Sequence, residues 1–183
     1  MGFDKALVKV YDSYGLLKIT ERLQQLFAEV WLLTDTKQKF PAAFSHLKIV
    51  DDLYPNQGPL GGLVTALTEV NTSSIFLMAC DMPQFTMEMI QQLARYRHEN
   101  QVVLFKQQGR LEPLFAFYQI TCQAAFKAQL FHSDWRLRSV FPQLSVREIA
   151  FSHNRQLANV NYQKELALWY SACREGEDHF GFL

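Results

Sequence analysis

The sequence has few of the features typical of secreted, membrane-spanning or nucleic-acid-binding proteins. Its 183 residues include 3 cysteines, Cys80, Cys122 and Cys173, with no CxxC pair, so neither a disulfide framework nor a zinc site is expected. Lysine plus arginine and aspartate plus glutamate both total 18, so no excess of positive charge favours nucleic acid. No apolar run reaches the roughly 18 residues of a membrane span, and no signal peptide is recognisable. These absences predict a cytoplasmic protein with no membrane or nucleic-acid partner.

Apolar residues, at 49% of the chain, recur at helical spacing between short apolar runs. The predicted strands cover residues 30–33, 47–50, 75–80, 102–105, 114–118 and 146–151. The predicted helices cover residues 16–27, 63–70, 86–96, 124–130, 135–141 and 162–172. This alternation predicts an α/β three-layer sandwich with a mostly parallel sheet. Without a linker or repeat, a single domain over residues 1–183 is expected, with its core at about 1–172 and a tail at about 173–183.

The run from Ile75 to Cys80 is continuously apolar and ends in Asp81, with Pro83 two places later. A strand without apolar–polar alternation is typical of a parallel sheet covered on both faces. Asp81 then lies at the carboxyl end of a strand, where open α/β sheets bind ligands. It either caps the following turn, as in most Asp-x-Pro turns, or binds a metal ion over a nucleotide site.

The segment QGPLGG, from Gln57 to Gly62, precedes a predicted helix. Its glycines permit close approach of the backbone and leave N–H groups at a helix N-terminus, so it could bind a phosphate or lie against a base. Taken alone, the segment is more simply an ordinary connection. Its position favours a site, because it lies between two acidic strand ends, Asp52 and Asp81, at one edge of the predicted sheet.

Two further polar positions have a structural and a functional interpretation. Lys5, in DKAL, is either a solvated surface lysine or a point charge for phosphate oxygens. Asn161, the last residue of NVN, fits the N-cap of the final predicted helix. The motif EPLFAFY, from Glu112 to Tyr118, is mostly a buried strand.

In chain order, MGFDKAL, VDDLYPNQGPLGGL, ACDMP, EPLFAFY and NVN resemble the motifs of the molybdenum cofactor guanylyltransferases. The match runs from Gly2 to about Trp169, and GPLGG together with CDMP is fairly specific. The resemblance implies a nucleotide-diphospho-sugar transferase-like (Rossmann-like) fold. It implies transfer of GMP from GTP to molybdopterin-bound molybdenum, with Mg²⁺ and release of pyrophosphate. It also suggests other cofactor-biosynthesis proteins as partners.

The resemblance assigns roles to individual residues of this sequence. Asp81 matches an Mg²⁺-binding aspartate, Lys5 matches a phosphate-contacting lysine, and Asp52 matches an acid near the guanine and ribose. Asn159 and Asn161 match the rim of the site on the acceptor side. The matching nucleotide-binding loop consists of Gly58, Pro59, Leu60, Gly61 and Gly62.

The chain departs from the family pattern at two places. Tyr162 stands where the family usually has Thr or Ser after NVN, which puts that local contact in doubt. In the family, a strand and a loop of the form LAGGxSxR precede MGxDK, whereas Met1-Gly2 stand here where the internal Met-Gly is expected. We therefore expect an interrupted sheet, weak GTP binding and negligible turnover from the chain as given, the result of a wrong start or a truncated gene.

Two other functions stay open at this point. GPLGG and CDMP do not decide the base, so a related nucleotidyltransferase acting with CTP, or on a sugar phosphate, is the first alternative. The second is a non-catalytic remnant that binds molybdopterin or a partner protein without turnover. A comparison of affinities for guanine and cytosine nucleotides separates the first alternative from the guanylyltransferase.

Overall fold

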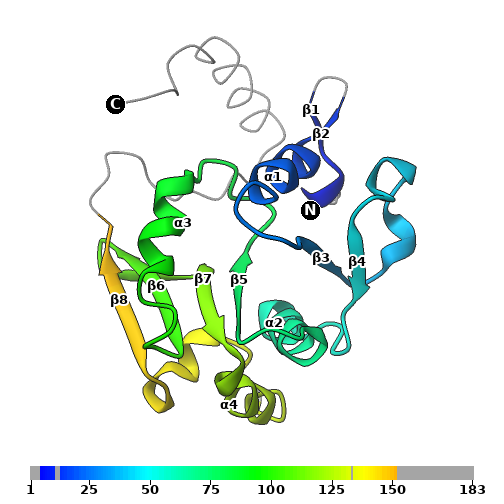
Figure 1. Ribbon diagram of the computed structural model, residues 1–183. Coiled ribbons are helices and arrows are strands. Elements are labelled where there is room, and N and C mark those ends of the chain that lie inside the picture. The colour runs from blue at the N-terminus through cyan, green and yellow to red at the C-terminus, as the bar shows by residue number, and fades with distance from the viewer. Residues whose placement is uncertain (1–4, 11–12, 133, 152–183) are drawn as a thin grey trace. The chain divides into compact units, whose positions relative to one another are not determined.

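The structure is a computed structural model that describes residues 5–10, 13–132 and 134–151 (Figure 1). The chain divides into two compact units. Unit 1 consists of residues 1–30, 80–84 and 157–183, and unit 2 of residues 31–79 and 85–156. Within the described residues, no helix is long and apolar enough to cross a membrane.

Among the described residues of unit 1, α1 (Gly15–Leu23) is a short amphipathic helix. The short 3₁₀ turn η1 (Lys5–Leu7) and the antiparallel pair of β1 (Lys9–Val10) and β2 (Ser13–Tyr14) precede it. Leu16, Leu17 and Ile19 are buried, which confirms the predicted apolar face. The helix ends earlier than predicted because the chain tightens into a turn, in which Leu26 N–H donates to the Leu23 carbonyl at 3.0 Å.

The strands of unit 2 form a mixed arrangement, which confirms the α/β class but not a mostly parallel sheet. Strand β3 (Trp31–Thr34) pairs in parallel with β4 (Lys48–Asp51). A separate sheet has the order β5-β7-β6-β8 (Figure 1), from β5 (Ser74–Met78), β7 (Arg110–Gln119), β6 (Val102–Gln107) and β8 (Val146–Ala150). Strand β7 is antiparallel to both neighbours, whereas β6 and β8 are parallel.

The antiparallel pairing of β6 and β7 follows from the turn between them. Gln108 and Gly109, within the segment QQGR, have φ angles of 48° and 79°. Two consecutive residues with positive φ form the tight hairpin turn that matches strand twist, and so short a connection permits only antiparallel strands. A parallel sheet would have required a long crossover at this place.

No ladder joins β3 to β5 among the described strands, so the sheet of unit 2 is interrupted there. Helix α2 (Gly58–Glu69) contacts both β3 and β5 and therefore packs on both sides of this interruption.

The other predicted helices of unit 2 are found with small shifts, except one. Helices α3 (Met87–Ala94) and α4 (Gln123–Gln129) agree with the prediction, and Thr86 caps α3 by accepting the Met89 N–H at 3.4 Å. The helix predicted for 135–141 was wrong, because Pro142 restricts the residue before it and the chain forms only short 3₁₀ turns. The 3₁₀ turns of unit 2 are η2 (Lys37–Lys39), η3 (Ala42–Phe44), η4 (Ile120–Cys122), η5 (Leu137–Ser139) and η6 (Phe141–Gln143).

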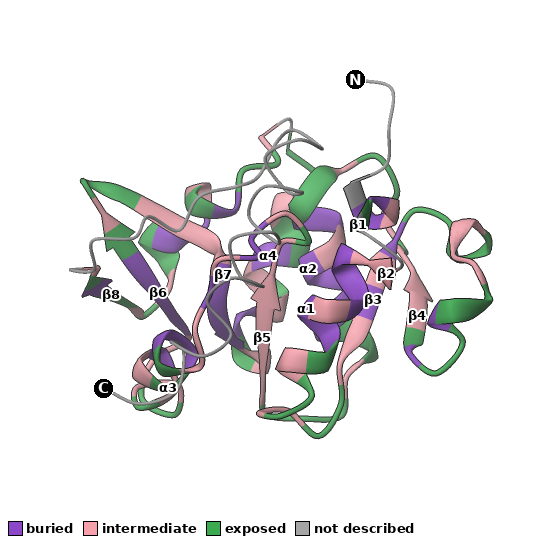
Figure 2. Cartoon of the chain, turned by 90° about the horizontal axis from the view of Figure 1, so that it is seen from above, coloured by how far each residue is buried: buried purple, intermediate pink, exposed green. Residues whose placement is uncertain are grey.

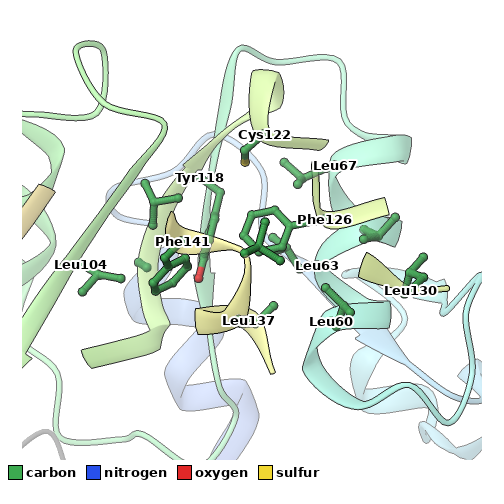
Figure 3. Packing of buried hydrophobic residues seen from close by; sticks show 14 residues of the cluster. Leu60, Leu63, Leu67, Leu104, Tyr118, Cys122, Phe126, Leu130, Leu137 and Phe141 are labelled. Carbon is green, nitrogen blue, oxygen red and sulfur yellow. The ribbon is translucent and has the colours of Figure 1, made fainter. Parts of the chain in front are cut away.

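The hydrophobic core of unit 2 lies between α2, α4 and the four-stranded sheet (Figure 3). Leu63 from α2, Tyr118 from β7 and Phe126 from α4 are all 0% exposed. The rings of Tyr118 and Phe126 meet edge to face, and the Tyr118 hydroxyl donates to the Pro113 carbonyl at 2.7 Å, which satisfies its polar end. Figure 2 shows β6 mainly in the colour of buried residues, so this sheet is the rigid part of unit 2.

Candidate nucleotide site

Two acidic residues end β4, and each one fixes a different loop of unit 2. The Asp51 carboxylate accepts the Lys37 N–H at 2.6 Å and so holds the start of η2. The ammonium group of Lys37 lies 3.6 Å from the same carboxylate, but both side chains are exposed, so this ion pair contributes little. The Asp52 N–H donates to the Thr34 carbonyl at 2.7 Å and extends the β3–β4 ladder by one residue.

The Asp52 carboxylate is bound to the segment that follows it. Its Oδ1 accepts the Tyr54 N–H at 2.9 Å and the Thr65 hydroxyl at 2.6 Å. The Thr65 hydroxyl in turn accepts the Leu53 N–H at 3.0 Å. One oxygen of Asp52 thus shapes the loop, while Oδ2 makes no hydrogen bond within the described part of the chain.

The glycine segment 58–62 is helical rather than a loop, because α2 begins at Gly58. Gly58 is exposed and has a φ of 56°, a conformation that favours glycine. Pro59, without an N–H, fits the first turn of a helix. No acidic residue of the helix itself lies in this turn.

Leu60 and Gly61 of this segment have packing roles. The Leu60 side chain belongs to the hydrophobic core, so a nucleotide could contact only its backbone. A Cβ atom on Gly61 would lie 2.4 Å from the Tyr54 carbonyl oxygen and 3.1 Å from Asp52 Oδ2. A Cβ atom on Gly62 would meet nothing within 4 Å. Only a glycine at position 61 therefore allows the loop after β4 to lie against α2.

Sequence patterns assign no individual role to two polar side chains near Asp52 and the start of α2, those of Thr65 and Gln57. Thr65 is fully buried in α2, and its signal was a hydroxyl inside the apolar run from Leu63 to Leu67. Gln57 precedes the helix, and its Oε1 is buried without a hydrogen-bond partner in the described residues. A buried oxygen of this kind is unusual in proteins and is a candidate ligand contact.

Asp81 follows β5 in the predicted way and belongs to unit 1. The last backbone bond of this strand runs from Ala79 N–H to the Leu114 carbonyl at 3.0 Å, and the chain turns at Cys80 and Asp81. Within unit 1, Arg22 of α1 donates through Nη1 to the Pro83 carbonyl at 3.1 Å. Asp81 is half-buried, on a turn held by a helix, as a fixed anchor for a ligand requires.

The remaining predicted residues are only partly accounted for. Lys5 is the first residue of η1 in unit 1. Asn159 and Asn161 lie outside the described residues, as do Tyr162 and the predicted final helix. Contacts of all these residues with a nucleotide stay predictions. The described residues contain no group of three or more His, Cys, Asp or Glu side chains that could hold a metal ion.

A comparison with known families places the chain. The model of the MobA-like NTP transferase domain matches residues 1–148. The chain belongs to this family. It is accordingly a nucleotidyltransferase, and the match includes Lys5, Asp52, the glycine segment and Asp81.

Its relatives in sequence have one common name. A protein of Carboxydothermus hydrogenoformans is 29% identical over 184 residues, which cover 92% of this chain and 90% of that protein. A protein of Clostridium perfringens (strain SM101) is 27% identical over 162 residues, covering 85% of this chain and 80% of that protein. Both are named "Probable molybdenum cofactor guanylyltransferase".

Solved structures confirm the nucleotide-diphospho-sugar transferase-like fold. The molybdopterin-guanine dinucleotide biosynthesis protein A of Archaeoglobus fulgidus superposes with a TM-score of 0.78 at 17% identity, covering 95% of this chain and 92% of that one. The 2-C-methyl-D-erythritol 4-phosphate cytidylyltransferase of Thermus thermophilus superposes with a TM-score of 0.68 at 12% identity, covering 93% and 94%. At these identities, the similarity establishes the fold alone.

Proposed function

We propose that this chain transfers GMP from GTP to the molybdenum cofactor, forming molybdopterin guanine dinucleotide and pyrophosphate. The observation that carries the proposal is the common name of relatives that align with 85% to 92% of the chain, within a nucleotidyltransferase family. The ordered motifs of the sequence and the helix N-terminus at Gly58 support it.

In this reaction, a terminal phosphate oxygen of molybdopterin attacks the α-phosphorus of GTP. A new phosphorus–oxygen bond forms while the bond to the β-phosphate oxygen breaks, and pyrophosphate leaves with the bonding electrons. The attacking phosphate is already ionised near neutral pH, so no side chain has to remove a proton. The protein is required to position the two substrates and to neutralise charge.

The residues of the chain fit a site for Mg²⁺ with few protein ligands. Mg²⁺ binds through one or two carboxylates and completes its octahedral shell with water and substrate phosphate oxygens, so a cluster of three protein ligands is not required. Asp81, with Oδ1 buried on a turn held by α1, has the oxygen chemistry that this ion prefers. Mg²⁺, when bound, would neutralise charge on the phosphates. Lys5 would add a positive charge on the phosphate oxygens.

The segment from Asp52 to Gly62 would hold the nucleoside part of GTP. The start of α2 offers backbone N–H groups, while Asp52 and Gln57 offer acceptor oxygens. Acceptors of this kind suit the N–H donors of guanine and the hydroxyl groups of ribose. Asn159 and Asn161 would contact the acceptor side, and other cofactor-biosynthesis proteins would be the partners that deliver or receive the cofactor.

The second candidate is transfer of CMP from CTP, because the motifs GPLGG and CDMP do not decide the base. Cytosine presents fewer N–H donors to a carboxylate than guanine does, so the acceptor oxygens at the start of α2 favour GTP. A competition between GTP and CTP for the same enzyme decides between them.

The test is formation of the dinucleotide cofactor and pyrophosphate from Mo-molybdopterin, Mg²⁺ and either GTP or CTP. It is carried out with the 183-residue chain and with the same chain joined to a strand and LAGGxSxR ahead of Met1. We expect guanylyl transfer from the extended chain. Asp81→Asn in the extended chain should abolish turnover with the fold intact, whereas Glu99→Gln, an exposed acid on unit 2, should not change it.

The outcomes separate the hypotheses. Product from CTP but not from GTP would show that the chain is a cytidylyltransferase and not a guanylyltransferase. No product from either nucleotide in the extended chain would refute nucleotidyl transfer to this cofactor. Unchanged turnover in Asp81→Asn would remove Asp81 from the reaction, and a loss of folding in this variant would support the turn-capping role instead.

A further inference from the structure

Thr65 differs from other described helical threonines in the direction of its hydrogen bonds. In α1 the Thr20 hydroxyl donates to the Leu17 carbonyl at 2.8 Å, and in α2 the Thr68 hydroxyl donates to the Val64 carbonyl at 2.7 Å. Both bonds stay within their own helix, which is the common arrangement. The Thr65 hydroxyl instead donates to Asp52 and accepts from Leu53, so it joins the middle of α2 to the loop after β4.

Two hydrogen bonds, one of them donated by Thr65, fix one oxygen of Asp52. Oδ1 accepts both the Thr65 hydroxyl at 2.6 Å and the Tyr54 N–H at 2.9 Å, so rotation of the carboxylate would break two hydrogen bonds. Thr65 is 0% exposed, which protects its bonds from exchange with water. The orientation of Oδ2 is therefore set by Thr65 rather than by Asp52 alone.

Asp52 Oδ2 lies at the first turns of α2. It is 3.1 Å from the position that a Cβ atom on Gly61 would take, and it makes no hydrogen bond in the described residues. Gln57 Oε1, on the same segment, is a second acceptor oxygen without a described partner. Both atoms can only accept hydrogen bonds, so a ligand at this place has to supply N–H or O–H donors.

We propose that Thr65 is a positioning residue that presents Asp52 Oδ2 to an N–H or O–H donor of the bound nucleotide. This role rests on the proposed function, because it requires that a nucleoside triphosphate binds at the start of α2. The donor belongs either to the purine base or to the ribose, which share the chemistry that a carboxylate oxygen recognises. Thr65 touches neither, and acts through Asp52.

The test combines equilibrium binding of GTP with hydrogen exchange in the 183-residue protein. Thr65→Val keeps the shape of the side chain but removes both hydrogen bonds, and Thr65→Ser keeps the hydroxyl. Thr68→Val is the matched control, because the Thr68 hydroxyl donates within α2. We expect Thr65→Val to raise the Kd for GTP about tenfold and to reduce the protection of the Leu53 and Tyr54 amides from hydrogen exchange. Thr65→Ser should behave like the unchanged protein in both measurements. Thr68→Val should show neither effect.

Nucleotide analogues identify the donor. ITP lacks the 2-amino group of guanine, and 2′-deoxy-GTP lacks one ribose hydroxyl. The analogue that lacks the donor contacted by Oδ2 should bind equally to the unchanged protein and to Thr65→Val. The other analogue should keep the tenfold difference.

Two results would overturn the role, and they are distinguishable from failure of the proposed function. If Thr65→Val exposes the Leu53 and Tyr54 amides while the Kd for GTP stays the same, Thr65 is structural only. The same conclusion follows if Thr65→Ser protects the Leu53 and Tyr54 amides from exchange but binds GTP as weakly as Thr65→Val does. If neither the unchanged protein nor the chain extended by a strand and LAGGxSxR binds GTP at any attainable concentration, the proposed function fails and the role of Thr65 fails with it.

Discussion

The four-stranded sheet and the β3–β4 pair of unit 2 are stabilised in different ways. In the four-stranded sheet, Val102, Leu104 and Phe115 are 0% exposed, so burial of apolar area provides most of the stability. In the β3–β4 pair, most residues are only half-buried, and directional hydrogen bonds from Asp51 and Asp52 hold the loops that follow. The comparison indicates a rigid scaffold beside a segment whose conformation depends on a few polar contacts, as binding loops commonly do.

The largest effect on stability is expected in the hydrophobic core between α2, α4 and the four-stranded sheet. Phe126→Ala removes a ring that is 0% exposed and lies 5.6 Å from the Tyr118 ring, so it should lower the free energy of unfolding by about 3–5 kcal/mol. Phe131→Ala, at a position that is 86% exposed, is the control and should change it by less than about 0.5 kcal/mol. Urea denaturation measures both, and equal losses would show that the core does not dominate.

The next effect is expected where the loop after β4 lies against α2. Gly61→Val places a Cβ atom 2.4 Å from the Tyr54 carbonyl oxygen, so the loop has to move, at a cost of about 1–3 kcal/mol. The structure predicts that stability and GTP binding fall together.

Gly62→Ala is the matched control for this prediction. A Cβ atom has open space there, and alanine favours a helix, so this variant should gain about 0.5–1 kcal/mol. Thermal unfolding and GTP titration of both variants provide the comparison. A stable Gly61→Val variant would show that the close approach at Tyr54 is easily relaxed.

A smaller effect is expected at the start of η2. Asp51→Ala removes the acceptor of the Lys37 N–H and should lower the free energy of unfolding by about 0.5–1.5 kcal/mol. Because a neutral N–H donates this bond and the exposed ion pair adds little, the loss should be nearly the same at low and high salt. A loss that disappears at high salt would contradict this assignment and leave the ion pair as its source.

The smallest effect concerns Glu112 on β7. Burial raises the pKa of the Glu112 carboxyl, and the nearby positive charge of Arg110 acts in the opposite direction. An acid whose pKa is raised on folding destabilises the native state when it is ionised, and the cost disappears as the pH falls through the folded and then the unfolded pKa.

Glu112→Gln should therefore raise the Tm slightly at pH 7. The gain should decrease on acidification and be absent below a pH of about 4.3, where the unfolded carboxyl is protonated. Exposed Glu99→Gln is the control in a series of thermal melts. A gain that persists at pH 4 would not come from the ionisation of Glu112.

The sequence by itself determined several helices and strands and the acidic residues that follow two of the strands. Apolar periodicity located α1, α2 and β5, and Thr86 predicted the start of α3. Asp52 and Asp81 were correctly placed after strands. These predictions succeeded because local patterns of this kind depend on neighbouring residues. The resemblance to a family, stated from the motifs, is confirmed by the family match over residues 1–148.

Only the tertiary structure decided how these elements combine. The separation of β3 from β5 depends on which strands pair, which is not a property of one segment. Likewise Thr65 lies 13 residues from Asp52 in sequence, and the need for glycine at position 61 comes from the Tyr54 carbonyl. Hydrogen bonds and close contacts between distant residues are set by packing, because a local sequence pattern does not encode which side chains meet.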